Sequence, residues 1–148
     1  MIKSLVDHYF FRVLMANNEA NSQPTIYPDY TDVTIPCNIA PLNFMVENAD
    51  ECIAQFCWAS ETQTYGNGKK IQIPLDEWQE MMQNAKGNAI QITVYTRQGE
   101  EWTRHKAFSI QVAQEEIDPY ISYRVISPSY IAYEMLSINQ RHLCNFDE

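Results

Sequence analysis

Glycine and basic residues are both scarce in this sequence. Only four glycines occur in 148 residues and none builds a glycine-rich loop, so a tight backbone cradle around phosphate groups is not expected. Ten Lys and Arg stand against 19 Asp and Glu, which gives a formal net charge of −9 at pH 7. Nucleic-acid backbones and anionic membrane surfaces are both bound by clustered basic side chains. The composition therefore argues against either as a partner.

Long apolar runs are also absent. No run of about 18 apolar residues occurs, so no membrane-spanning segment is predicted. Residues 1–23 lack the uninterrupted apolar core of a secretion signal, because charged or polar side chains break it. The spacing of Leu5, Tyr9 and Val13 instead predicts a short amphipathic helix, followed by a polar linker.

The four cysteines show neither a CxxC motif nor metal-ligand spacing. We expect free and mostly buried thiols. Cys52 and Cys57 lie an odd number of residues apart, so on one strand they face opposite sides and cannot pair with each other. In an oxidising compartment, Cys37 could instead pair with either of them across neighbouring strands.

No catalytic or metal-binding motif stands out. The three histidines are isolated from one another, and His105, in the charged stretch TRHK, is expected to be exposed. Adjacent carboxylates such as Glu100 and Glu101 would point to opposite faces of a strand and cannot share a proton. We predict that the protein is not an enzyme and has no metal or cofactor. An active site would have to be assembled from polar residues that only folding brings together.

Alternating apolar residues predict β-strands through most of the chain. Residues 51–60 place Cys52, Ala54, Phe56 and Trp58 on one face, whereas residues 61–70 are predicted to form a loop. Residues 89–116 form the strongest pattern, a β-hairpin with an apolar face and a wet face that includes Tyr95. Two prolines within Val33–Val46 predict a kinked edge strand.

One helix interrupts this β pattern. Residues 76–86 place four apolar side chains at helical spacing, namely Trp78, Met81, Met82 and Ala85. Asp76 is the predicted N-cap, with Gln79 completing a capping box. The fold class predicted is all-β: an immunoglobulin-like or fibronectin-III-like β-sandwich with one inserted short helix and small terminal helical segments. The C-terminal helical segment would begin at Ser127 and Pro128.

Aromatic residues are concentrated after Asp118, whose side chain is predicted to fix a turn before Pro119. Tyrosine suits protein interfaces, because its ring can be buried while its hydroxyl stays wet. The predicted interface residues are Tyr120, Tyr123, Tyr130, Ile131, Tyr133 and Leu136. A second hypothesis is a carbohydrate-binding module in which Trp102 and Tyr95 stack on sugar rings from the wet face of the hairpin.

Two segments, YPDYTDVTIPCNIAPLNF (27–44) and DPYISYRVISPSYIAYEMLSINQRHLCNFDE (118–148), resemble the N-terminal region of a family of bacterial cell-envelope proteins. Members of that family carry a TolB-like β-propeller, and some are labelled cytochrome c biosynthesis proteins. In the family, an Ig-like module precedes a CxxCH motif and the propeller. This chain contains neither of these, so the resemblance implies architecture and a cell-envelope location but no haem-binding residue.

Three regions are therefore expected: an amphipathic and linker segment at 1–23, an Ig-like β-sandwich at 24–118, and a tyrosine-rich docking segment at 119–148. The predicted function is that of a non-enzymatic accessory module of a TolB-like propeller-type protein. Its predicted partner is a propeller domain, another envelope protein or a second copy of the chain. Docking would use the tyrosine-rich segment and the edge strand Val33–Val46.

Overall fold

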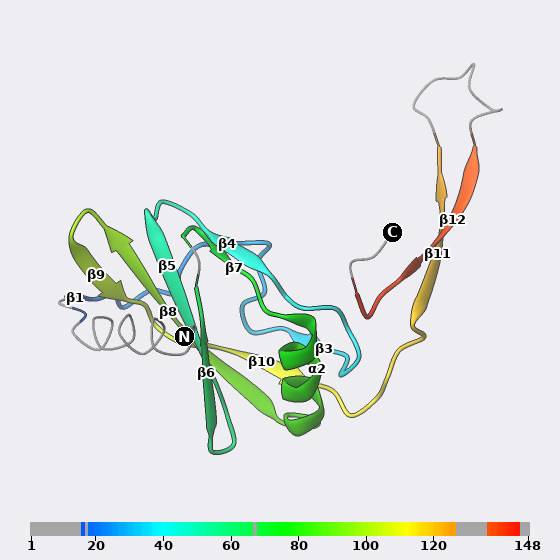
Figure 1. The fold of residues 1–148 in the computed structure, drawn as a ribbon, viewed down its shortest axis with the longest axis horizontal. Coiled ribbons are helices and arrows are strands. Elements are labelled where there is room, and N and C mark those ends of the chain that lie inside the picture. The colour runs from blue at the N-terminus through cyan, green and yellow to red at the C-terminus, as the bar shows by residue number, and fades with distance from the viewer. Residues whose placement is uncertain (1–15, 17, 67, 127–135, 146–148) are drawn as a thin grey trace.

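The computed structural model describes residues 16, 18–66, 68–126 and 136–145, which form three β-sheets and one helix (Figure 1). The main sheet has seven strands: β1 (Asn18–Glu19), β3 (Thr34–Ile35), β5 (Glu51–Trp58), β6 (Glu61–Tyr65), β8 (Ala89–Gln98), β9 (Glu101–Arg104) and β10 (Phe108–Val112). The second sheet contains β2 (Ile26–Tyr27), β4 (Phe44–Val46) and β7 (Lys70–Ile71). The third contains β11 (Tyr120–Val125) and β12 (Ser137–His142), and the helix is α2 (Leu75–Asn84).

Strand β8 is the centre of the main sheet. It pairs antiparallel with β5 along one edge, and with β9 and then β10 along the other. The predicted hairpin of residues 89–116 is therefore present, although its second strand is interrupted between Arg104 and Phe108. Beyond it, β1 runs parallel to β9 and β3 runs parallel to β10. At the opposite side of the sheet, β5 pairs with β6.

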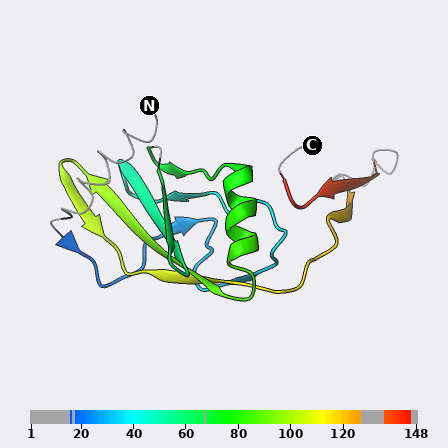
Figure 2. The same cartoon turned by 60° about the horizontal axis from the view of Figure 1, so that its bottom comes forward.

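One hydrophobic core is shared by the two larger sheets and the helix. Phe44 of β4 and Ile71 of β7 belong to the same buried cluster as Phe56 of β5 and Ile92 of β8. Trp78 of α2 completes it, as its helical spacing predicts. The prediction of a mostly β architecture is confirmed. We call the two larger sheets and α2 the body; α2 lies on the side of the body that is nearer to the C-terminal hairpin (Figures 1 and 2).

The helix begins earlier than predicted. Pro74 is the N-cap residue and accepts the first helical hydrogen bond, from the Trp78 backbone N–H at 2.9 Å. No side-chain cap is present, so the prediction that Asp76 caps the helix is wrong. Asp76 instead lies in the first turn, where its negative charge interacts favourably with the positive end of the helix dipole. The Asn43 side-chain oxygen accepts a hydrogen bond from Ile73 N at 2.9 Å and helps to hold the chain as it enters the helix.

Two strand predictions need correction. Residues 61–65 form β6 rather than a loop, because the chain reverses at Ala59, whose φ is 48°, and then pairs back along β5. The segment Val33–Val46 is divided between two sheets. Its first part, β3, is an edge strand, but β4 lies in the centre of the second sheet between β2 and β7. Its two prolines fall between these strands, which is where the backbone leaves one sheet for the other.

Candidate docking surface

The C-terminal hairpin projects away from the body in both views (Figures 1 and 2), and we call residues 118–126 and 136–145 the arm. Its two strands pair antiparallel from Tyr120 opposite His142 to Val125 opposite Ser137. Every residue of β11 is exposed, and no arm residue belongs to the hydrophobic core formed by the described residues. An isolated two-stranded hairpin is only marginally stable in water. Among the described residues, nothing forms a covering layer over the arm.

One face of the arm carries a continuous apolar row. Residues directly opposite one another in an antiparallel pair point to the same face, and alternate residues of one strand share a face. Ile121, Tyr123 and Val125 therefore form a row along β11, with exposed fractions of 46%, 44% and 46%. Their cross-strand neighbours on β12 are polar: Arg141, Asn139 and Ser137. This combination of an apolar row with a polar border is the usual anatomy of a protein interface.

The opposite face is more mixed. Tyr120 contacts the ring of His142 edge-on, with ring centroids 4.9 Å apart. Arg124 and Ile138 lie opposite each other further along, and Ile138 is the most exposed large apolar side chain of the described residues at 78%. Ile126 and Leu136, at the ends of the two strands, are also exposed.

The base of the arm is clamped to the body by the loop that contains Asn38. The Asn38 side-chain amide nitrogen donates to the Ile117 carbonyl at 2.8 Å, and its amide oxygen accepts from the Ile117 N–H at 3.0 Å. Two residues further on, the Ala40 N–H donates to the carbonyl of Leu143 at 2.8 Å. The loop thus holds both ends of the hairpin at its base. The Asn38 side chain binds the segment before β11, and the Ala40 backbone binds the segment after β12.

Helix α2 in turn fixes this loop. The Trp78 indole Nε1–H donates to the Ile39 carbonyl at 2.8 Å, and the Trp78 ring is buried in the core.

Within the arm, Asp118 Oδ1 accepts from the Tyr120 N–H at 2.9 Å, which confirms its predicted turn role. The Leu143 N–H donates to the Pro119 carbonyl at 2.7 Å and closes the base. Hydrogen bonds therefore hold the base of the arm against the body.

The predicted interface residues divide into two groups. Tyr120, Tyr123 and Leu136 are exposed on the arm. Tyr130, Ile131 and Tyr133 lie outside the described residues, as does the helical segment predicted to begin at Ser127. Their joint role in an interface stays a prediction.

The two aromatic residues predicted to stack on sugars are not exposed. Trp102 retains 9% of its accessible surface and Tyr95 retains 7%. They form a small separate cluster with Ile53, against which Ala16 packs. The prediction that Tyr95 lies on a wet face is wrong, because this cluster covers that part of β8. Neither ring offers the open face that stacking requires.

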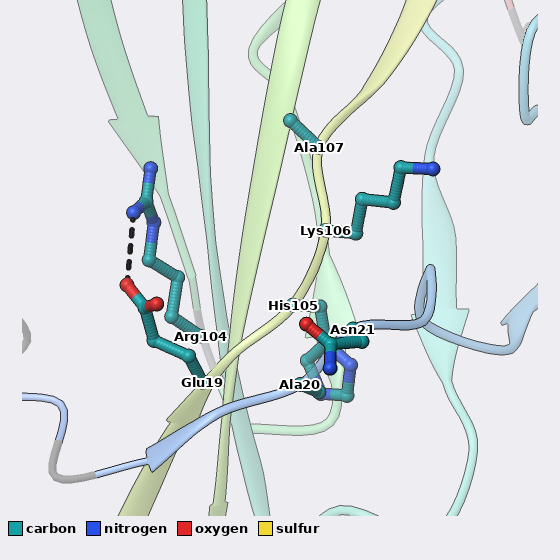
Figure 3. Close-up of a pocket in the computed structure, with 7 residues that line it drawn as sticks. All are labelled: Glu19, Ala20, Asn21, Arg104, His105, Lys106 and Ala107. Atoms are coloured by element: carbon teal, nitrogen blue, oxygen red, sulfur yellow. Dashed lines mark hydrogen bonds and ion pairs between the residues drawn. The ribbon is translucent and has the colours of Figure 1, made fainter.

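A polar pocket of about 410 Å³ lies where β9 ends, around His105. Glu19 and Arg104 form an ion pair at 3.3 Å on one side, and Lys106 is directed away from them (Figure 3). The two basic groups therefore do not converge on a common point. Ala20 and Asn21 line the same pocket as His105 (Figure 3).

His105 itself is half-buried, so its predicted exposure is wrong. Its Nε2 lies 2.8 Å from Thr96 Oγ1, and its Nδ1 is buried without a hydrogen bond of good geometry. Burial lowers the pKa of His105, and the nearby Ser22 backbone opposes this in part. The contact with Thr96 joins the segment that follows β9 to strand β8.

A second pocket, of about 310 Å³, lies between α2 and the base of the arm. Cys37 and Cys144 both line it, and all four cysteines are free in this structure. Cys37 is buried, with its Sγ 3.6 Å from the Glu115 carbonyl.

Cys52 lies on β5, away from the residues that line this pocket. Burial raises the pKa of Cys52 to about 11, which keeps this thiol protonated and unreactive at neutral pH.

Across the described residues, no three His, Cys, Asp or Glu side chains gather closely enough to hold a metal ion. In the same part of the chain, no helix is both long and apolar enough to cross a membrane. Comparisons of the chain with models of protein families, with curated proteins and with solved structures found no match. The arm, with its exposed apolar row, is therefore the candidate docking surface.

Proposed function

We propose that this chain is a non-enzymatic protein-interaction module that docks through its arm. The observation that carries this proposal is the exposed row of Ile121, Tyr123 and Val125, on a two-stranded sheet that no other described element covers. A protein that exposes such a row on a projecting arm gains from covering it with another protein surface. The clamp at Asn38 supports the same conclusion, because an arm held in one orientation loses less entropy on binding.

The apolar row alone is too small to account for stable binding. Fully burying a large aliphatic side chain contributes about 1.5–3 kcal/mol, so three half-exposed side chains supply only about 3 kcal/mol together. Association costs about 4 kcal/mol or more in lost translational and rotational freedom. The arm must therefore also use its polar border, its second face or the free backbone edges of its strands. Strand addition to another sheet would supply the last of these.

We further propose that the body is an immunoglobulin-like β-sandwich, which suits an accessory module. Two features of the topology support this: β3 runs parallel to β10 at the edge of the main sheet, and β2, β4 and β7 form a separate antiparallel sheet. Residues of both sheets meet in one core. Sandwich domains place their loops and terminal extensions at the two ends of the fold, where they can reach a partner.

The partner class follows from the resemblance of residues 27–44 and 118–148 to cell-envelope proteins with a TolB-like propeller. The arm belongs to the second of these segments. On this proposal, the chain acts in the cell envelope, and its arm docks on a propeller domain, another envelope protein or a second copy of the chain. The carbohydrate-binding alternative is not favoured, because Trp102 and Tyr95 are buried.

Photo-crosslinking tests the docking role. A photoreactive phenylalanine analogue would replace Tyr123 on the arm or, as a matched control, Gln91, which is exposed on β8. In cells that naturally make the protein, we expect a protein adduct from position 123 and none from position 91. The adduct should disappear when Ile121→Ser and Val125→Ser are added, and mass spectrometry would identify the partner. An adduct yield from position 123 no higher than from position 91 would refute the proposal.

A further inference from the structure

Cys37 and Cys144 lie far apart in the chain but line the same pocket, between α2 and the base of the arm. Cys37 belongs to the body, and Cys144 belongs to the arm. The other residues that line the pocket carry no charge: Asn38, Ile39, Trp78, Gln79, Met82 and Gln83. Two thiols, one from each part of the molecule, therefore border one uncharged pocket.

Two backbone hydrogen bonds bring the thiols to this pocket. A turn spans residues 36–39, is closed by a backbone hydrogen bond of 3.5 Å and has Cys37 in its second position. Directly after this turn, the Ala40 N–H donates to the carbonyl of Leu143 at 2.8 Å. Leu143 is the residue before Cys144. The two cysteines therefore flank the contact that joins the body to the end of the arm.

The strand order keeps Cys37 away from the other two cysteines. Cys37 follows β3 by two residues, whereas Cys52 and Cys57 lie on β5. Strands β3, β10, β8 and β5 are neighbours in this order, so three strand spacings, about 14 Å in total, separate β3 from β5. A disulfide requires two Cα atoms within about 7 Å of each other. The sheet therefore does not bring Cys37 to Cys52 or Cys57, and the pocket offers Cys144 instead.

The two thiols of the pocket differ in how firmly they are held. Cys37 is 2% exposed and belongs to the hydrophobic core. Cys144 is partly exposed, and it does not belong to that core. The end of the arm can therefore adjust toward Cys37 without disturbing the core. A dissolved oxidant would also reach Cys144 first, because it is the more exposed thiol.

We infer that Cys37 and Cys144 form a disulfide that fixes the base of the arm to the body. The oxidant would be a small-molecule disulfide such as oxidised glutathione. The Cys144 thiolate attacks one of its sulfurs, which forms a mixed disulfide and releases one glutathione. The Cys37 thiolate then attacks the Cys144 sulfur and displaces the second glutathione. The two thiols of the protein lose two protons and two electrons, and the oxidant takes up both to become two molecules of reduced glutathione.

This bond would regulate docking by the arm. In the reduced chain, hydrogen bonds hold the base of the arm against the body. A covalent link restricts the base further, so the arm loses less entropy when it binds a partner. An oxidising compartment, such as the cell envelope proposed for this chain, favours the linked form. The regulation rests on the proposed function, since it acts on the same arm, whereas the formation of the bond does not.

Disulfide mapping of the purified full chain tests the bond itself. The chain would be equilibrated with reduced and oxidised glutathione, its remaining thiols alkylated, and its peptides identified by mass spectrometry. We expect peptides linked through Cys37 and Cys144, formed about tenfold or more readily by the folded chain than by the same chain in urea. Cys144→Ser should abolish the link. The matched control Cys57→Ser, which replaces the other partly exposed cysteine, should form it as the wild type does. Thiols that stay unlinked, or that link no more readily than in urea, would overturn the inference.

Amide hydrogen exchange tests whether the bond fixes the arm. The N–H groups of Tyr120, Leu143 and Ala40 make the hydrogen bonds at the base of the arm. Oxidation should slow their exchange in the wild type, whereas Cys144→Ser, treated with the same oxidant, should exchange as the reduced wild type does. Equal rates in the oxidised and reduced wild type would refute the regulatory role.

Photo-crosslinking from position 123 separates this regulation from docking itself. In cells, the adduct yield should be lower in Cys144→Ser than in the wild type. An equal yield would refute the regulation and leave the docking role in place. A chain that forms the Cys37–Cys144 link but gives no adduct would refute the docking role and leave the bond in place.

Discussion

At the scale of single residues, Asn38 links the body to the arm. Its amide makes two hydrogen bonds with the backbone of Ile117 and so imitates a strand partner. The Asn38→Asp substitution keeps the shape but places a carboxylate oxygen against the Ile117 carbonyl. The lost hydrogen bond should cost about 1 kcal/mol or somewhat more. Because the core does not contain Asn38, we expect this cost to fall on the base of the arm.

Limited proteolysis would measure this effect. Cleavage around Ile117 should be faster in Asn38→Asp than in the wild type, while the body remains intact. Asn21→Asp is a suitable control, because it makes the same chemical change at another exposed asparagine. Equal cleavage rates at Ile117 in all three proteins would show that the Asn38 contacts do not hold the arm.

His105 predicts a pH dependence of stability. Burial lowers its pKa in the folded state below the ordinary value of 6.5, so the unfolded chain binds a proton more readily than the folded chain. The free energy of unfolding should therefore decrease as pH falls through 6.5 and level off below the folded-state pKa. His105→Gln removes this contribution and leaves every other ionisable group in place.

Urea unfolding of the wild type and His105→Gln across this pH range would isolate the contribution of His105. The difference in unfolding free energy between the two proteins should change with pH in the direction given above. A difference that stays constant from neutral pH to below 6.5 would contradict a lowered pKa for His105.

At the scale of elements, the body and the arm have separate sources of stability. The body rests on the shared core around Trp78 and Phe56, while β11 and β12 contribute no residue to that core. The variant Ile121→Ser/Tyr123→Ser should therefore change the thermal unfolding of the body little, since substitutions at exposed sites usually cost less than about 0.5 kcal/mol. A core substitution, Met81→Ala, should cost about 2–5 kcal/mol.

Differential scanning calorimetry of these two variants beside the wild type would compare the two costs. Met81 is fully buried, so Met81→Ala sets the scale of a core change. If Ile121→Ser/Tyr123→Ser lowers the melting temperature of the body as much as Met81→Ala does, the arm belongs to the core after all.

The elements that could be predicted are those with a buried face and a clear period. Alternating apolar residues predicted β5, β8 and β10, and helical spacing around Trp78 predicted α2. Each pattern extends over several residues, and one face of each element meets the core. Strand β12 could not be predicted, since Ser137–His142 buries no face and contains one large apolar residue, Ile138. The two-residue strands are too short to show any period.

The candidate site was only partly predictable for a related reason. The tyrosine content after Asp118 indicated an interface, but the row of Ile121, Tyr123 and Val125 exists only because β12 pairs with β11. The clamp joins Asn38 to Ile117 across 79 positions of the chain, and no local pattern reports such a contact. Tyr95 was misplaced because the small cluster that buries it is also assembled by tertiary packing.

At the scale of the whole molecule, the acidic excess lies mostly in residues 1–118, which contain 8 Lys and Arg against 16 Asp and Glu, whereas residues 119–148 contain 2 against 3. A net charge of −9 makes copies of the chain repel one another at long range. Docking through the arm depends on the orientation of the arm, which the Asn38 clamp holds.

Hydrogen–deuterium exchange of the wild-type chain, alone in dilute solution and with the partner that crosslinking identifies, tests the central claim, that the arm docks, most directly. In dilute solution the amides of β11 and β12 should exchange rapidly, because an uncovered two-stranded hairpin opens easily. When the partner is added, protection should appear in β11 and β12, while β8 remains protected throughout. Slow exchange of the arm in dilute solution, unchanged by the partner, would contradict the account.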